Sequence, residues 1–318
     1  MAPPSSLPML LGDEEVRAHL DAPTTLAAVR TALLDHHRGR LNAPARVAAS
    51  LGDDRLVFTS GRGPEHLGFR AYLTTPDSDQ LVAVWHRDGT LRALVYGREL
   101  GPRRTGAIGG VAVDVLARRE ASRLGVVGVG QQAWTQIWAI ASVRRLSEVT
   151  LYGRRPDRAA DLAQRVRERL GLTVRLAPSA EEAVREQDVV VTATSSRTPV
   201  IEPDWVAPGT HLNCLGPKSR SAREIPATLV ERADLVVTDS LAQAAESGTG
   251  PEDGPLCDPA AMVGLGALVA GDHPGRRAPR EVTLFASTGL AGTEVAVAMA
   301  AAERVVGPAG DQGGTRQG

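Results

Sequence analysis

The chain has 318 residues, of which 42% are hydrophobic, so it is long enough for about two domains with sizeable cores. Its 36 basic and 37 acidic side chains nearly cancel, which disfavours a nucleic-acid partner, and no apolar run reaches the ~18 residues of a membrane-spanning helix. The N-terminus carries no signal-peptide pattern, and two cysteines, Cys214 and Cys257, make no disulfide framework. We therefore expect a cytoplasmic protein, and the spacing of the seven histidines predicts no metal site.

The first third of the chain predicts a helix and then an antiparallel sheet. Residues 13–38 carry apolar side chains at helical spacing, and Asp13 can cap the helix. Four short strands follow, separated by turn residues: 56–58, 69–73, 81–85 and 91–96. A helix is expected over 104–118, and its many Gly and Ala residues imply a close partner, which could be a second subunit.

From residue 124 the pattern changes to strands that alternate with helices. Six strands joined by crossover helices predict a parallel, doubly wound sheet. A last strand and a terminal helix over 294–306 follow, and the polar tail from Gly307 is expected to be disordered. The seven predicted strands are 124–127, 149–152, 174–176, 189–192, 211–215, 235–238 and 282–285.

The turn after the first strand of this sheet carries a dinucleotide-binding pattern. Leu124–Val127 runs into Gly128-Val129-Gly130-Gln131-Gln132-Ala133, the Gly-x-Gly-x-x-Ala form that opens a helix. Gly128 would allow the tight turn, Gly130 the close approach of a pyrophosphate, and Ala133 the close packing of helix on sheet. The anion would bind the free N–H groups at the helix N-terminus.

The end of the second strand indicates which cofactor is bound. Gly153, Arg154 and Arg155 follow Tyr152, and no Asp or Glu stands at the strand end. An acid there binds the ribose 2′-hydroxyl of NAD, whereas Arg accommodates the 2′-phosphate of NADP. The pattern favours NADP(H) over NAD(H), although NAD(H) remains possible because an ordinary basic turn has the same composition.

Six motifs in a fixed order resemble those of the ornithine cyclodeaminase/μ-crystallin family over about residues 12–306. They are Pro44-Ala45-Arg46, Gly68-Phe69-Arg70, Arg104-Thr105-Gly106-Ala107, the Gly128–Ala133 turn, Asn213-Cys214-Leu215-Gly216 and Ser287-Thr288-Gly289-Leu290-Ala291. The resemblance implies a homodimer in which residues 1–119 and 290–318 form an α+β domain for substrate binding and dimerisation. A Rossmann domain, residues 120–289, would be inserted between the two pieces.

The resemblance and the strand ends together give the candidate site residues. Arg46, Arg70 and Arg104 match the positions that bind the substrate carboxylate, although the family usually has Lys at the second. Thr194 and Ser195 could instead form a turn, and the Ser287 segment could instead cap the last helix. The expected cofactor contacts are Thr105, Gly128, Gly130, Gln131, Gln132, Ala133, Arg154, Arg155, Thr194, Ser195, Asn213, Leu215, Gly216, Ser287 and Gly289.

Two carboxylates of the family's cyclodeaminases have no counterpart here. Lys218 stands where those enzymes have an Asp, and no acid occurs in residues 56–58, where they have a Glu. Ornithine cyclisation needs carboxylates that accept protons and stabilise cationic iminium intermediates. Reduction of an imine needs only one proton at nitrogen, which Lys218 could donate as the catalytic acid. Lys218 could alternatively bind phosphate, contact a second substrate carboxylate or face solvent.

These features predict an NADPH-dependent reductase of a small cyclic ketimine carboxylate, of the Δ1-pyrroline-2-carboxylate or Δ1-piperideine-2-carboxylate type. Three alternatives stay open at this point. They are an amino-acid or opine-type dehydrogenase, an ornithine or lysine cyclodeaminase with bound NAD, and a non-catalytic NADPH-binding protein like the μ-crystallins.

Overall fold

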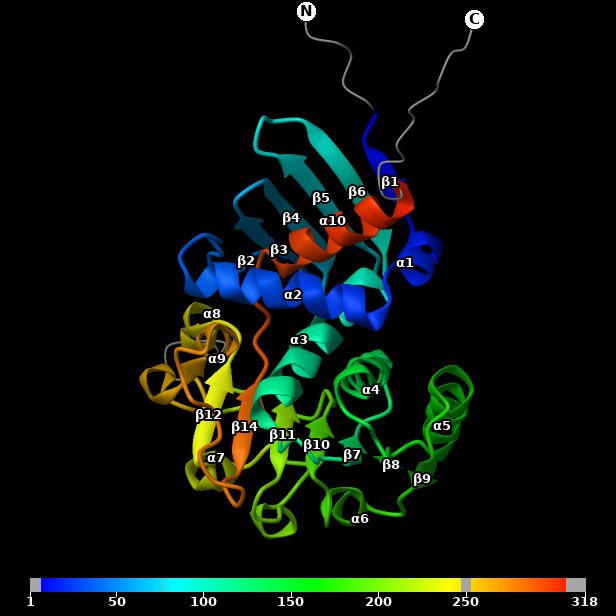
Figure 1. Ribbon diagram of the computed structural model, residues 1–318, viewed down its shortest axis with the longest axis vertical. Helices are drawn as coiled ribbons and strands as arrows, with labels where there is room; N and C mark the ends of the chain where they lie inside the picture. The colour runs from blue at the N-terminus through cyan, green and yellow to red at the C-terminus, as the bar shows by residue number, and fades with distance from the viewer. Residues whose placement is uncertain (1–6, 76, 247–252, 307–318) are drawn as a thin grey trace, which may run out of the picture.

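Two sheets organise the chain in a computed structural model that describes residues 7–75, 77–246 and 253–306 (Figure 1). The first sheet has six strands in the order β1-β6-β5-β4-β3-β2, and its neighbours are antiparallel except for β1 and β6. The tail from Gly307, expected to be disordered, lies outside the described residues. The strands are β1 (Met9–Leu11), β2 (Val47–Leu51), β3 (Asp54–Arg62), β4 (His66–Leu73), β5 (Gln80–His86) and β6 (Leu91–Gly97).

Helices from both ends of the chain cover one face of the first sheet. In Figure 1, α2 (Ala22–His37) and α10 (Thr293–Val306) lie across it, and α1 (Asp13–His19) lies beside them. Val29 of α2 and Val295 of α10 share a buried core with Val84. The single helix expected over 13–38 is wrong, because Asp21 accepts a hydrogen bond from the N–H of Thr24 and starts a new helix.

The other face of the first sheet is apolar and exposed. Its central row crosses five strands, and each of its residues faces the next in the strand register. The larger side chains are between 37% and 67% exposed. The row consists of Val47, Phe58, Ala71, Leu81 and Tyr96.

The second sheet is parallel throughout the described residues, with eight strands in the order β13-β12-β14-β11-β10-β7-β8-β9. The predicted doubly wound fold is confirmed. Its short strand β13 was not predicted. The strands are β7 (Arg123–Val127), β8 (Glu148–Tyr152), β9 (Val174–Leu176), β10 (Val189–Thr192), β11 (His211–Cys214), β12 (Leu235–Thr238), β13 (Val263–Gly264) and β14 (Thr283–Ala286).

Helices pack on both faces of the parallel sheet. Ile137 of α4 (Gln131–Val143) and Val166 of α5 (Pro156–Leu170) are buried with Val126 on one face. On the other face, Val184 of α6 (Ala180–Val184) and Leu229 of α7 (Ala227–Arg232) are buried in a separate core. Shorter helices complete this half: η1 (Pro203–Trp205), α8 (Leu241–Ala245), η2 (Pro259–Ala261) and α9 (Leu265–Ala270).

The strand order of the parallel sheet reverses between β7 and β10. From β7 the chain builds outward through β8 and β9, and β10 then returns to the other side of β7. Ligands of open α/β sheets bind outside the carboxyl ends of the strands at such a reversal. The fold therefore places the Gly128–Ala133 turn, which follows β7, at the expected binding crevice.

The small-residue helix α3 (Leu100–Leu116) joins the two halves (Figure 1). A Cβ added to Gly106 would lie 2.4 Å from the carbonyl oxygen of Thr135, and one on Gly109 would lie 2.1 Å from Gln136 Oε1. Its close partner is therefore α4 of the same chain, and the helix gives no reason to expect a second subunit. None of the described helices has the length and apolar character to cross a bilayer.

Candidate active site

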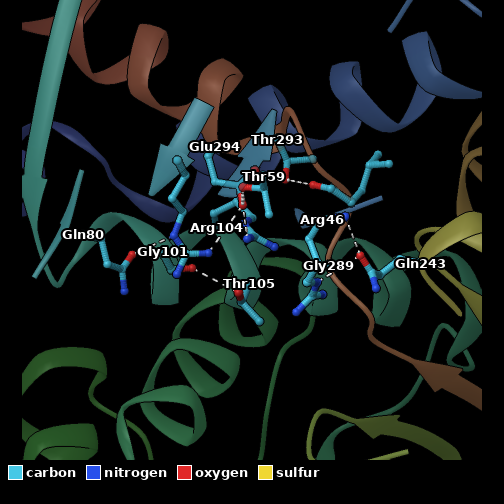
Figure 2. A network of polar contacts seen from close by, with 12 residues as sticks. Arg46, Thr59, Gln80, Gly101, Arg104, Thr105, Gln243, Gly289, Thr293 and Glu294 are labelled. Atoms are coloured by element: carbon cyan, nitrogen blue, oxygen red, sulfur yellow. Dashed lines mark hydrogen bonds and ion pairs between the residues drawn. The ribbon is translucent and has the colours of Figure 1, made fainter. Parts of the chain in front are cut away.

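Two of the three predicted substrate arginines converge on one turn. Arg46 precedes β2 and Arg104 lies near the start of α3, while Gly289 follows β14. A Cβ added to Gly289 would lie 3.2 Å from Arg104 Nη1 and 3.7 Å from Arg46 Nη2. Figure 2 shows Arg46, Arg104 and Gly289 in one network. Both guanidinium groups therefore lie beside the same turn, an arrangement that suits a carboxylate ligand.

Arg70 reaches the same network from β4 but already has several partners. Its Nε donates to Gln80 Oε1 at 3.0 Å, and its guanidinium carbon lies 4.1 Å from the centre of the Tyr72 ring. Its Nη1 lies 3.5 Å from Glu294 Oε1. Two of its guanidinium nitrogens thus have protein partners, against one in Arg104.

Glu294 is a site residue that the sequence analysis missed. It lies in the first turn of α10, is 1% exposed, and its Oε1 accepts hydrogen bonds from Arg104 Nη2 and from Thr59 Oγ1. Thr59 follows residues 56–58 directly in β3. A buried carboxylate of the last helix thus lies beside β3, and it is paired with Arg104 and Arg70. Nothing in the sequence next to the Ser287–Ala291 motif marks Glu294 as the partner of Arg104, which is 190 residues away in the chain.

Charge keeps Glu294 ionised. Burial would raise the pKa of this carboxyl, but the positive charges of Arg104 and Arg70 outweigh it and hold the pKa below its usual 4.5. Burial and the neighbouring Arg104 lower the pKa of Arg70. Arg104 Nε is buried and has no hydrogen-bond partner in the described part of the chain. An anionic ligand at this point would satisfy that donor.

The Gly128–Ala133 turn has the geometry that a dinucleotide requires. Gly128 has φ of +118°, and a Cβ there would lie 2.3 Å from the carbonyl oxygen of Ala193. A Cβ on Gly130 would meet no atom within 4 Å, and no side chain caps the N-terminus of α4. The first N–H groups of α4 are thus open to an anion. Among neighbouring side chains, Gln131 bonds Arg165, whereas Gln132 Oε1 is buried without a partner among the described residues.

The basic turn after β8 is exposed. Arg154 and Arg155 are exposed and form no ion pair within the described residues. Gly153, just before them, lies against the Val129 side chain of the dinucleotide turn. The two arginines thus follow directly after a residue that packs on the dinucleotide turn, and their exposed side chains are available to a ligand.

Glu224 is a second carboxylate that the sequence analysis did not identify, and it forms hydrogen bonds with the residues that follow β10 and β11. Glu224 is fully buried and accepts hydrogen bonds from Thr194 N and Oγ1, both at 2.9 Å, and from the N–H of Gly216. Leu215 N in turn bonds the carbonyl oxygen of Thr192 at 3.0 Å. Of the expected cofactor contacts at these ends, Thr194 is thus occupied by Glu224, while Ser195 is exposed.

Lys218 folds back on the end of β11. Its Nζ donates to the carbonyl oxygen of Leu215 at 2.9 Å and to that of Gly216. Burial lowers the pKa of Lys218, and the nearby Glu224 opposes that change. The ammonium group therefore lies at the crevice edge with two of its protons bound to backbone oxygens.

Asn213 is turned away from the expected cofactor contact. Its amide nitrogen donates to the carbonyl oxygen of Gly109 and to Gln136 Oε1, both at 3.0 Å, and its Oδ1 pairs with His211 Nε2 at 2.9 Å. The side chain is buried, so it joins β11 to α3 and α4 instead of facing a ligand. The cofactor contact expected of this residue stays a prediction, and the side chain already has partners within the protein.

The other two cofactor candidates are held by the protein. Thr105 Oγ1 donates to the carbonyl oxygen of Gly101 at 3.0 Å, and Ser287 N donates to that of Cys214 at 3.0 Å. Ser287 does not cap α10, because that helix begins at Thr293. No three His, Cys, Asp or Glu side chains within the described ranges are grouped so that they could hold a metal ion.

Known proteins resemble this chain over nearly its whole length. A Delta(1)-pyrroline-2-carboxylate reductase of Bacillus cereus is 36% identical over 316 residues, which cover 94% of this chain and 97% of that protein. The solved structure of the Thermococcus litoralis Delta(1)-pyrroline-2-carboxylate reductase in complex with NADH and L-proline has a TM-score of 0.85 and 27% identity. It covers 94% of this chain and 97% of that one.

A second solved structure has the same arrangement. An archaeal alanine dehydrogenase dimer with bound NAD has a TM-score of 0.84 and 28% identity, covering 94% of this chain and 96% of that one. The model of the ornithine cyclodeaminase/mu-crystallin family matches residues 7–308. The chain belongs to the ornithine cyclodeaminase/mu-crystallin family.

Proposed function

We propose that this protein reduces the C=N bond of a small cyclic ketimine carboxylate with NADPH, giving a cyclic α-amino acid. The ring is of the Δ1-pyrroline-2-carboxylate or Δ1-piperideine-2-carboxylate type. The observation that carries the proposal is the convergence of Arg46 and Arg104 on Gly289 at the crevice. The similarity of this chain to Delta(1)-pyrroline-2-carboxylate reductases supports the choice of substrate.

The arginines would bind and orient the substrate. Arg46 and Arg104 would each donate to the carboxylate, and two such contacts fix both the position and the rotation of a planar group. Arg70, tied to Glu294 and Gln80, would add positive charge and support Arg104. The α-carbon of the imine would then be held toward the ends of β10 and β11.

The crevice would hold the cofactor beside that carbon. The N–H groups at the start of α4 would bind the pyrophosphate, with Gly128 and Gly130 giving it room. Thr194, Ser195, Leu215 and Gly216 would line the nicotinamide end. A bound reduced nicotinamide would supply the hydride that the imine carbon accepts.

Lys218 would supply the proton. Hydride addition at carbon leaves the lone pair on nitrogen, which must take one proton to give the amine. The half-buried Lys218 ammonium, whose pKa lies below its usual value, is a suitable general acid at the edge of the crevice. The carbonyls of Leu215 and Gly216 would keep Nζ in place through the reaction.

We further propose NADP(H) as the cofactor. The solved relatives hold NADH and NAD, so this choice depends on the Arg154 and Arg155 side chains of this chain. Both are exposed at the end of β8, and a guanidinium pair matches a 2′-phosphate in charge and geometry.

The exposed apolar row on the first sheet supports a homodimer. Apolar side chains on five neighbouring strands form one continuous surface, and such a patch is typical of a subunit interface. Two copies related by a two-fold axis would bury the same face of each.

One assay tests the function. Purified protein would be mixed with NADPH and a panel of cyclic ketimines, keto acids with amines, and ornithine, and loss of the reduced cofactor and release of ammonia would be followed. Stoichiometric oxidation of NADPH by a cyclic ketimine is expected. Turnover only of keto acids with an amine, ammonia release from ornithine, or no turnover at all would reject the proposal.

A further inference from the structure

Asp239 is a buried carboxylate at the end of β12 that holds the turn after the neighbouring strand β14. It directly follows β12, is 2% exposed, and binds the turn after β14 through four hydrogen bonds. Oδ1 accepts from Thr288 N at 2.7 Å and Thr288 Oγ1 at 2.9 Å. Oδ2 accepts from Gly289 N at 2.8 Å and Leu290 N at 3.1 Å. Three consecutive N–H groups are thus held by one side chain.

This turn contacts the proposed substrate arginines. Gly289 has φ of +86°, a conformation that glycine adopts without strain. The carbonyl oxygen of Thr288 accepts a hydrogen bond from Arg46 Nη2. A shift of the turn would therefore move the acceptor that orients this guanidinium.

The residues after Asp239 hold Arg46 from a second side. Gln243 of α8 accepts hydrogen bonds through Oε1 from the main-chain N–H of Arg46 at 3.1 Å and from its Nε at 2.9 Å. Ser240 caps α8 by accepting from the N–H of Gln243 at 3.2 Å. Figure 2 shows Gln243 beside Arg46.

The partners of Arg46 are neutral, in contrast to those of Arg104. Arg46 makes no ion pair within the described residues, and its guanidinium bonds a side-chain amide and a main-chain carbonyl. Arg104 shares its charge with Glu294. Neutral acceptors fix the direction of Arg46 and leave its charge for an incoming anion.

We infer that Asp239 is a positioning residue for substrate binding, which acts through the Thr288–Leu290 turn on Arg46. The segment 239–243, which follows β12 of the parallel sheet, would thereby orient Arg46, which directly precedes β2 of the first sheet. The inference deepens the proposed function and rests on it, because Arg46 must bind the substrate carboxylate.

The chain contains a matched control at the other end of the same strand. Asp234 precedes β12, and its Oδ2 accepts from Val282 N at 2.7 Å where β14 begins. Both acids join β12 to β14 through a main-chain N–H, but only Asp239 lies at the end that contacts Arg46. Asp239→Asn and Asp234→Asn therefore separate positioning from sheet stability.

The experiment measures the kinetics of the ketimine reaction and the binding of L-proline to the NADPH complex. Asp239→Asn is expected to raise KM and the dissociation constant of L-proline at least tenfold, with a smaller change in kcat and unchanged NADPH affinity. Asp234→Asn is expected to lower the melting temperature without the KM effect. Gln243→Met removes one hydrogen-bond acceptor of Arg46 directly and should raise KM in the same way. It replaces Asp239→Asn as the test variant if Asp239→Asn does not fold.

A double variant tests the route. In an Arg46→Ala background, Asp239→Asn should raise KM no further, because the group it positions is gone. Wild-type substrate affinity in both Asp239→Asn and Gln243→Met, or equal effects in Asp234→Asn and Asp239→Asn, would overturn the inference alone. Absence of ketimine turnover and L-proline binding in the wild-type protein would instead overturn the proposed function and the inference with it.

Discussion

Glu294 and Arg104, 190 residues apart in the chain, form an ion pair in which both side chains are almost fully buried. Arg70 reaches the same carboxylate oxygen, so one negative charge lies between two positive ones. This arrangement leaves the site with an excess of positive charge while fixing the direction of Arg104. Glu294 should therefore affect both the stability of the protein and its substrate affinity.

Replacing Glu294 with Gln should destabilise the fold by about 3 kcal/mol, because removal of one partner leaves buried charges uncompensated. KM for the ketimine should rise, since Arg104 and Arg70 then repel each other without a shared partner. Chemical denaturation and steady-state kinetics measure the two effects. Glu303→Gln, on the exposed face of the same helix, is the control and should change neither. An unaltered unfolding free energy in the Glu294 variant would contradict the assigned ion pair.

Replacing Arg154 and Arg155 together with Ser should raise KM for NADPH at least tenfold and leave KM for NADH almost unchanged. The guanidinium groups are expected to contact only the 2′-phosphate, which NADH lacks. Arg169→Ser, an exposed arginine in the last turn of α5, controls for loss of general positive charge. Equal losses with both cofactors would assign the two arginines another role.

Lys218→Met should lower kcat by ~10²- to 10⁴-fold, the usual range for loss of a general acid. NADPH affinity measured by fluorescence should stay the same. In the wild type, the lowered pKa of Lys218 means that activity falls as the pH rises through a value below 10.5, because the neutral amine has no proton to give. A variant with wild-type kcat would show that the proton comes from elsewhere.

Asp in place of both Phe58 and Leu81 should convert a dimer to a monomer, because the apolar row would then carry desolvated charges at its centre. Light scattering coupled to size-exclusion chromatography measures the mass directly. Leu176→Asp introduces the same change at a similarly exposed leucine, but on β9 of the parallel sheet. If the double variant keeps the mass of the wild type, the row is not the interface.

His211 should make the protein less stable in acid. Burial lowers its pKa from 6.5 to about 3, so the folded state holds the neutral ring while the unfolded chain takes up a proton below pH 6.5. The unfolding free energy should therefore lose about 1.4 kcal/mol for each pH unit between 6.5 and 3 through this group. Urea titrations at several pH values should give a shallower slope for His211→Gln. A slope equal to that of the wild type would mean that His211 is charged when folded.

Seven of the eight strands described in the parallel sheet could be predicted to within a residue or two, because each is a short apolar run that ends in a turn. Strand β2 could not, since all five of its side chains are exposed and no alternation marks them. Likewise, a single apolar pattern over residues 13–38 did not reveal the break at Asp21.

The arginines could be recognised because they stand in ordered motifs, whereas their partners could not. Asp239 and Glu294 contact groups that are far away in the chain, and no local spacing reports such a contact. Asn213 was identified by its motif, but a motif does not tell which way an amide points. The direction of the Lys218 side chain could not be predicted either, because its Nζ donates a hydrogen bond to the carbonyl oxygen of Leu215.

The last of the described strands, β14, lies between β12 and β11 in the interior of the parallel sheet, and α10 follows it onto the first sheet. A polypeptide that stopped before Thr283 would lack a central strand of one half and a covering helix of the other. During synthesis on the ribosome, neither half can be completed until the final segment has emerged. Premature termination anywhere upstream should therefore leave two unfinished sheets, with no intact nucleotide-binding fragment to persist in the cell.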